Sequence, residues 1–167
     1  AALVPLLGWP AAASLAAAHP RLPLGGPDPP GNATKGGGGG KRHVSATVYH
    51  VLLGSKSVAD VRVRSDNGGF DLVPANRELA GAEVELVEVA HRETRLKEAL
   101  AAVEPEYDFI LIDCPPALSL LTVNGLTAAQ AVMIPMQCEY YALEGLSDLV
   151  QTIKKVRGHL NPSLEIE

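Results

Sequence analysis

Asp113 is the residue of this chain that is best placed to do chemistry, because it directly follows the apolar run at residues 109–112. A continuous apolar run of this length is typical of a strand buried on both faces of a parallel sheet. Pro115 and Pro116 cannot donate to a strand ladder, so we expect the strand to end before them. A lone carboxylate at such a strand end can hold Mg²⁺ through water, as phosphoryl-transfer enzymes require. The alternative is an aspartate that only caps the following loop.

Other candidate site residues follow two further predicted strands. Asn76 and Arg77 come after the strand predicted at 70–74, and Pro135 and Gln137 leave the strand predicted at 131–135. Because the carboxyl ends of parallel strands meet at one edge of a sheet, these residues are expected to face the same ligand crevice as Asp113. For Asn76 and Arg77, a turn and helix cap is an equal alternative.

A basic cluster lies on the last predicted helix. Lys154, Lys155 and Arg157 are close together there, with His159 behind them. Such a cluster can contact the phosphates of DNA without reading its sequence. A solvated helix face, with cations near the helix C-terminus, is the alternative interpretation.

Strand and helix patterns alternate along the chain, which predicts an α/β fold with a doubly wound, mostly parallel sheet flanked by helices. The chain ends in the apparent onset of another strand, so we expect this fold to be incomplete at both ends. Strands are expected at 70–74, 109–112 and 131–135, and a short strand or extended segment at 58–63. Helices are expected at 45–53, at 78–102 with a break around His91, at 118–128 and at 143–159.

Length and composition fit one globular domain. The chain has 167 residues, of which 47% are apolar, and a net charge of −5. That charge gives no overall nucleic-acid signature, so any DNA contact must come from a local patch. Cys114 and Cys138 have no partner at metal-ligand spacing, which predicts two reduced thiols in a cytoplasmic protein.

The first 43 residues differ in amino-acid composition from the rest of the chain, because Ala, Pro, Gly and Leu dominate them. Residues 11–18 are good helix material. Residues 1–18 resemble the apolar core of a secretory signal, but they lack a preceding basic region and are interrupted by proline. We therefore expect neither a signal peptide nor a membrane span. The predicted division is a degenerate segment at 1–43 and an α/β domain at 44–167.

Three stretches of sequence resemble one known family. They are SATVYHVLLG from Ser45, GGFDLVPANRELAGAEVEL from Gly68, and YDFILIDCPPALSLLTVNGLTAAQAVMIPMQCEYYALEGLSDL from Tyr107. In this order they resemble the ParA/Soj chromosome- and plasmid-partitioning ATPases, which are P-loop NTPases related to the cell-division ATPase MinD. The resemblance covers roughly residues 28–167.

The resemblance implies a cytoplasmic, nucleoid-associated ATP hydrolase that uses Mg²⁺. It implies a homodimer that binds DNA nonspecifically, is stimulated by a centromere-binding ParB-like partner, and does not bind membranes. Asp113 would hold the water shell of Mg²⁺, and Asp28 would position the attacking water. Asn76, Pro135 and Gln137 would lie near the nucleotide. A MinD-like ATPase that positions the division site, or a non-enzymatic truncated remnant, are the alternatives.

The chain departs from the family pattern near its start. The glycine run at residues 35–41 looks like the family's KGGxGK phosphate loop, but Arg42 stands where a Ser or Thr should bind magnesium. The run also follows residues 28–34, which resemble an element that comes after the phosphate loop in this family. We therefore expect the glycine run to be a surface loop, and the chain to be a fragment that lacks the phosphate loop. Asp28 can equally be a turn-forming residue.

Overall fold

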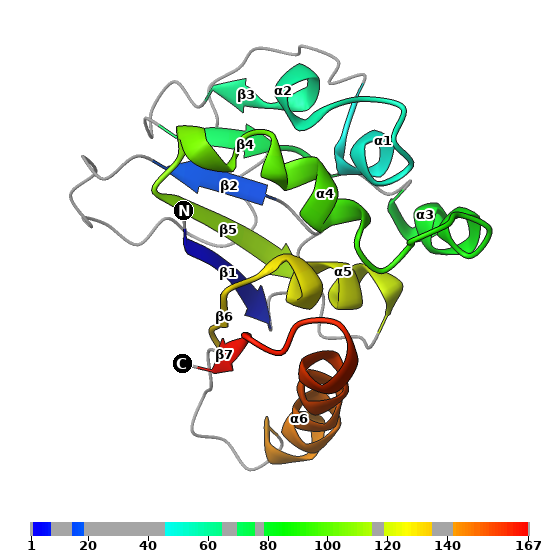
Figure 1. Ribbon diagram of the computed structural model, residues 1–167, viewed down its shortest axis with the longest axis vertical. Coiled ribbons are helices and arrows are strands. Elements are labelled where there is room, and N and C mark those ends of the chain that lie inside the picture. Colours follow the sequence, from blue (N-terminus) through cyan, green and yellow to red (C-terminus); the bar gives the residue numbers. More distant parts are fainter. Residues whose placement is uncertain are drawn as a thin grey trace.

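The computed structural model in Figure 1 describes residues 2–7, 15–18, 46–64, 70–75, 79–114, 119–134 and 142–166. The elements, in chain order, are β1 (Ala2–Leu7), β2 (Leu15–Ala18), α1 (Val48–Leu52), α2 (Val58–Val61), β3 (Val63–Arg64), β4 (Asp71–Val73), α3 (Leu79–Leu86), α4 (Arg95–Ala101), the 3₁₀ turn η1 (Glu104–Glu106), β5 (Phe109–Cys114), α5 (Leu120–Ala128), β6 (Ala131–Val132), α6 (Ala142–His159) and β7 (Glu165–Ile166).

A five-stranded sheet with the order β1-β5-β2-β4-β3 forms the centre of the described chain. β1 pairs parallel to β5, whereas β2 is antiparallel to both β5 and β4, and β3 is antiparallel to β4. β1, β5 and β4 therefore run in one direction and β2 and β3 in the other. The short parallel pair β6–β7 lies beside β1. The predicted α/β class is confirmed, but the described sheet is mixed rather than mostly parallel.

β2 is the main departure from the sequence prediction, since the alanine-rich residues 11–18 were expected to be helical and Leu15–Ala18 is a strand. Its direction follows from the connection. Only residues 8–14 separate β1 from β2, and a parallel return needs a crossover of roughly a dozen residues or more. A connection this short brings the chain back antiparallel. Tertiary pairing thus outweighs the helix propensity of alanine.

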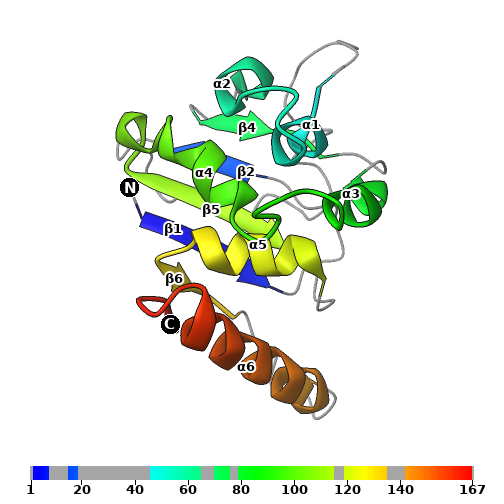
Figure 2. The same ribbon diagram turned by 45° about the vertical axis from the view of Figure 1, so that its right-hand side comes forward.

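The sheet is covered on one face by α4 and α5, as Figures 1 and 2 show. On β5, Ile110, Ile112 and Cys114 are buried on that face, whereas Phe109 and Leu111 on the other face are 50% and 37% exposed. The prediction that this strand is buried on both faces is therefore wrong. The side chains of a strand alternate between the two faces, and the described helices pack on only one of them.

Local capping explains where the first helices begin. Thr47 is the N-cap of α1, which lies within the helix expected at 45–53, and the helix is closed by Gly54, whose φ of +76° suits glycine. Residues 58–61 were expected to be extended but form α2, because Ser57 and Asp60 make a reciprocal capping box. The sequence pattern missed this short helix.

The helical stretch predicted at 78–102 is broken near the expected point. α3 ends at Leu86, α4 begins at Arg95, and His91 between them has a φ of +56°. The apolar side chains that the two helices turn inward are buried, and Val89 in the connection between them is partly buried. The buried side chains are Leu79, Ala82, Leu86, Leu96 and Leu100.

α5 packs unusually close to β5 at Gly125. A Cβ atom added to Gly125 would lie 2.6 Å from Cys114 Sγ and 3.6 Å from Ile112 Cγ2. Glycine is therefore required here by the space available rather than by its backbone conformation. The contact fixes the separation between α5 and the strand that carries Asp113.

We expect Gly125→Ala to lower the free energy of unfolding by about 1–3 kcal/mol, because the added methyl group overpacks the contact with Cys114. Chemical denaturation measures the change. Adding Cys114→Ala to the same chain should restore part of the loss, since it removes the clashing sulfur. Gly158→Ala is the matched control: its Cβ meets nothing within 4 Å, so it should stabilise α6 slightly. Equal destabilisation by both substitutions would contradict the packing argument.

Candidate functional site

Asp113 lies near the carboxyl end of β5, an interior strand between β1 and β2. It shares the outer face of the sheet with Phe109 and Leu111 and is turned away from α5. One carboxylate oxygen, Oδ1, is buried and has no hydrogen-bond partner among the described residues. A buried acceptor without a partner is costly, so this oxygen is poised for a donor or a cation.

Burial raises the pKa of Asp113 to about 6. No described cation offsets this effect of burial, so the carboxylate is electrostatically uncompensated near neutral pH. A hydrated Mg²⁺ ion would supply both positive charge and O–H donors, and Mg²⁺ is usually bound by only one or two carboxylates that leave it several waters. The orphaned oxygen therefore fits such an ion. No group of three or more potential ligands forms a metal site within the described ranges.

The carboxyl ends of β4 and β5 point to the same edge of the sheet, as predicted. α1 is fixed at this edge, where Val48 N–H donates to the carbonyl of Pro74 just after β4 (2.9 Å). The end of β4, the start of α1 and Asp113 therefore lie at the same edge of the sheet. Five predicted site residues lie outside the described residues: Asp28, Asn76, Arg77, Pro135 and Gln137.

Asn124 is a buried residue that the sequence analysis missed. It is 1% exposed, its amide donates to the carbonyls of Arg92 (2.7 Å) and Leu120 (3.0 Å), and its Oδ1 accepts from Leu96 N–H (3.1 Å). These bonds fasten the α3–α4 connection and the first turn of α4 to α5. An asparagine inside an otherwise apolar helix was the signal that could have indicated such a role.

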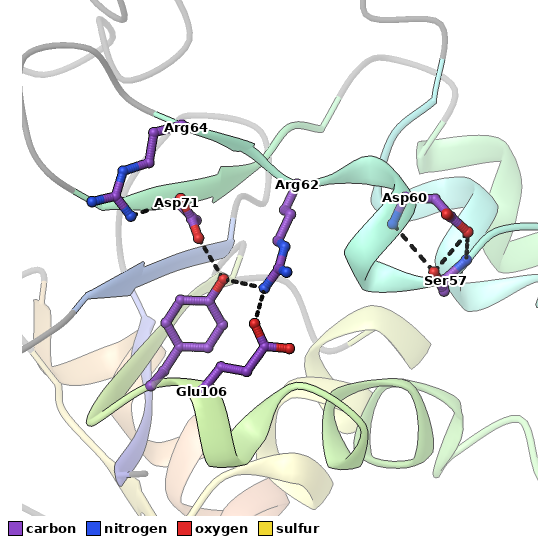
Figure 3. A network of polar contacts seen from close by, with 7 residues as sticks. Ser57, Asp60, Arg62, Arg64, Asp71 and Glu106 are labelled. Carbon is purple, nitrogen blue, oxygen red and sulfur yellow. Dashed lines mark hydrogen bonds and ion pairs between the residues drawn. The ribbon is translucent and has the colours of Figure 1, made fainter.

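A polar network joins the amino end of β5 to the β3–β4 hairpin (Figure 3). Tyr107 donates its hydroxyl hydrogen to Asp71 Oδ2 (2.5 Å), and Arg62 donates to the Tyr107 oxygen (2.7 Å) and to Glu106 (2.6 Å). Arg64 pairs with the other oxygen of Asp71 (3.2 Å). Burial acts to raise the pKa of Asp71, but the bonds from Tyr107 and Arg64 outweigh it and hold that pKa below its usual range.

We expect Tyr107→Phe to lower the free energy of unfolding by about 1–2 kcal/mol, because a partly buried hydrogen bond to a carboxylate is lost. In a double-mutant cycle with Asp71→Asn, measured by denaturation, the coupling should be about 1 kcal/mol. A folded-state pKa below the unfolded value means that this stability is present above about pH 4 and lost as the pH falls further. Tyr49→Phe, which removes a surface bond to Glu85, is the control and should cost less. Additive effects of the paired substitutions would exclude the coupling.

The predicted basic cluster lies on α6, which packs against α5. The side chains of Lys154, Lys155 and Arg157 are exposed, and none forms an ion pair within the described part of the chain. The cluster is therefore available for an anionic partner. No helix in the described segments is long and apolar enough to cross a lipid bilayer.

Comparison with known sequences gives consistent matches. A family model described as an AAA domain matches residues 10–166. The chain is 47% identical over 156 residues to the chromosome partitioning protein ParA of Caulobacter vibrioides, covering 92% of this chain and 58% of that protein. It is 53% identical over 140 residues to the sporulation initiation inhibitor protein Soj of Bacillus subtilis, covering 84% of this chain and 55% of Soj. The chain thus spans less than three fifths of the length of these relatives.

Among solved structures, the chain is similar to cobyrinic acid a,c-diamide synthase from Mycobacterium smegmatis, solved with a bound ATP analogue and magnesium. The TM-score is 0.76 at 35% identity, and the match covers 99% of this chain and 59% of the other. That relative thus holds a nucleotide and a metal ion on a fold of the same kind.

Proposed function

Because the chain belongs to the ParA/Soj family of partitioning ATPases, we propose that the protein containing it hydrolyses ATP to drive chromosome or plasmid partitioning. The observation that carries this proposal is the uncompensated carboxylate of Asp113 near the carboxyl end of an interior strand, where open α/β sheets bind ligands. The reaction is phosphoryl transfer from ATP to water.

Asp113 would hold Mg²⁺ through its water shell, and the ion would neutralise charge on the transferred phosphate. The tight packing of α5 against β5 at Gly125 supports this role, because it fixes the position of the strand that carries Asp113. A carboxylate with a raised pKa and no cationic partner gains most from such an ion.

The remaining site assignments rest on the family resemblance. Asp28 would orient the attacking water, and Asn76, Pro135 and Gln137 would line the nucleotide site. β4, which precedes Asn76 in the sequence, ends at the same sheet edge as Asp113, and this supports the inclusion of Asn76 in the proposed group. The relative's name, chromosome partitioning protein ParA, supports a partitioning role. The homodimer, the ParB-like partner, nonspecific DNA binding and a cytoplasmic location are part of the proposal and rest on the family resemblance.

A magnesium-dependent thermal shift with ATP on this chain tests nucleotide binding directly. The proposal expects the melting temperature to rise with ATP and Mg²⁺ together, because a ligand that binds only the native state stabilises it. An Asp113→Asn chain should lose the magnesium-dependent part of the rise. No shift in the unsubstituted chain would favour the non-enzymatic remnant.

We further propose that the exposed cations of α6 contact DNA phosphates. Replacing both Lys154 and Lys155 by alanine should then weaken binding to all sequences alike and reduce the slope of log affinity against log salt by roughly 2. Fluorescence anisotropy with duplex DNA over a salt series measures the slope. The matched control replaces Lys56 and Lys97, two exposed lysines elsewhere, and should leave the slope unchanged. An unchanged slope in the α6 variant would remove α6 from the DNA-binding surface.

A further inference from the structure

A cavity of about 260 Å³ lies between the α4–η1 stretch and the end of α5, and Asn161 after α6 also lines it. Glu104 precedes β5 and Gln130 precedes β6, so the cavity lies at the amino end of β5, whereas Asp113 is near its carboxyl end. At about 30 Å³ per water molecule, it has room for about eight or nine waters, or for one small organic molecule. The cavity is therefore separate from the proposed nucleotide site.

Thr127 contributes a buried hydroxyl group to this cavity. The residue is 1% exposed, and its Oγ1 has no hydrogen-bond partner in the described chain. Asn161 beside it has partners of its own, since its amide donates to the carbonyls of Leu126 (3.0 Å) and Ala129 (2.7 Å). Its Oδ1 accepts from Ser163 (3.0 Å). Because an orphaned buried hydroxyl is costly, an occupant that bonds to Thr127 is favoured.

Two opposite charges line the α4–η1 wall of the cavity. Lys97 of α4 forms no ion pair among the described residues, neither with Glu104 nor with another carboxylate. Glu104 accepts a long hydrogen bond from Gln130 (3.5 Å), and a carboxylate has room for further donors. The remaining wall is apolar and buried, and it includes Leu100, Ala128 and Ala129. The cavity thus offers a cation, an anion and a hydroxyl group around an apolar interior.

An occupant that matches this lining must carry both signs of charge. A simple anion would suit Lys97 but would be repelled by Glu104, and a simple cation would meet the reverse problem. The apolar interior favours an apolar body on the same molecule. We propose that the cavity binds a free α-amino acid with an apolar side chain. Its carboxylate accepts from Lys97 and Thr127, and its ammonium group donates to Glu104. The site involves neither ATP nor Asp113, so its failure leaves the proposed ATPase function untouched.

Isothermal titration calorimetry of the chain with L-leucine, L-isoleucine, L-valine and L-methionine tests the site. At least one of these should bind saturably. The tightest binder is then compared with the analogue that lacks its ammonium group and the analogue that lacks its carboxylate, which for leucine are 4-methylpentanoate and 3-methylbutylamine. Each analogue should bind about tenfold more weakly, because one charge of the cavity is left without its partner. Saturable binding by none of these amino acids would overturn the proposal, and so would analogues that bind equally well.

Substitutions in the cavity test the assigned contacts. Lys97→Met should weaken binding of the amino acid about tenfold, and Thr127→Val about fivefold. Thr127→Val also removes the orphaned hydroxyl, so it should raise the melting temperature, and its weaker binding is then no folding defect. Glu104→Gln should abolish the preference over the analogue without the ammonium group, because the repulsion of that anion is gone.

Lys56→Met is the matched control for Lys97→Met. Lys56 is an exposed lysine outside the cavity, so its substitution should leave amino-acid binding unchanged. Equal affinities of the two methionine variants would overturn the proposal. A Glu104→Gln chain that still prefers the amino acid to its analogue would do the same.

Discussion

Asp113→Ala is expected to reduce magnesium-dependent ATP hydrolysis by the protein that contains this chain by about 100-fold or more. The reason is that stabilisation of phosphate charge by a metal ion is worth several kcal/mol, and each 1.36 kcal/mol changes a rate tenfold. A steady-state assay of phosphate release over a magnesium series measures it. Asp108→Ala is the control, because Asp108 lies just before the other end of β5, and it should leave the rate unchanged. Normal hydrolysis by the Asp113 variant would refute the assigned role.

Removing the charge of Asp113 should have the opposite effect on stability. The folded-state pKa of Asp113, about 6, is above the unfolded value of about 4, so the native state binds the proton more tightly. Stability therefore falls as the pH rises from about 4 to 6, and near neutral pH the buried charge costs about 1–2 kcal/mol after solvent screening is allowed for. Asp113→Asn should recover this cost at pH 7 and flatten the profile. If a substitution at Asp113 lowers activity but raises stability, Asp113 serves the function of the protein rather than the stability of its fold.

Asn124→Ala is expected to cost about 3 kcal/mol in the free energy of unfolding. The substitution removes three hydrogen bonds and leaves the buried Leu96 N–H without its partner, and such orphaned groups carry most of the penalty. Urea denaturation at neutral pH gives the value. The connection between α3 and α4 should also exchange its amide hydrogens faster, because its anchor to α5 is gone.

Gln130→Ala is the matched control for that experiment. Gln130 carries the same amide group but is exposed, and its hydrogen bond to Glu104 is long (3.5 Å). Its loss should change stability by less than about 0.5 kcal/mol. A similar cost for both substitutions would mean that burial of Asn124 does not decide the effect.

Patterns confined to a few neighbouring residues predicted much of this fold. The apolar run and the prolines after it predicted β5 and its end, the pattern at 45–53 predicted α1, and the break expected around His91 separates α3 from α4. In each case the deciding interaction joins residues close in sequence. A strand end, a helix cap and a helix interruption are all of this kind.

Features that depend on distant residues were not predictable. Tyr107 and Asp71 are 36 residues apart, and Asn124 reaches residues 28 and 32 positions away, so no local pattern signals either contact. The direction of β2 and the single covered face of β5 likewise depend on which elements pack together. For the site, the sequence located Asp113 but gave no indication that Oδ1 would be buried without a partner.

Cys114 packs against Gly125 of α5, so the accessibility of its thiol reports local separation of α5 from β5. Burial, with a contribution from the nearby Asp113 charge, raises the pKa of Cys114 to about 12, and the side chain is 3% exposed. A maleimide reagent needs an accessible thiolate, so labelling can proceed only when α5 lifts away from β5. In a chain with Cys138 replaced by serine, the labelling rate would therefore measure how often α5 separates from β5, the strand that carries Asp113. Slower labelling in the presence of Mg²⁺ and ATP would report ligand binding without any assay of turnover.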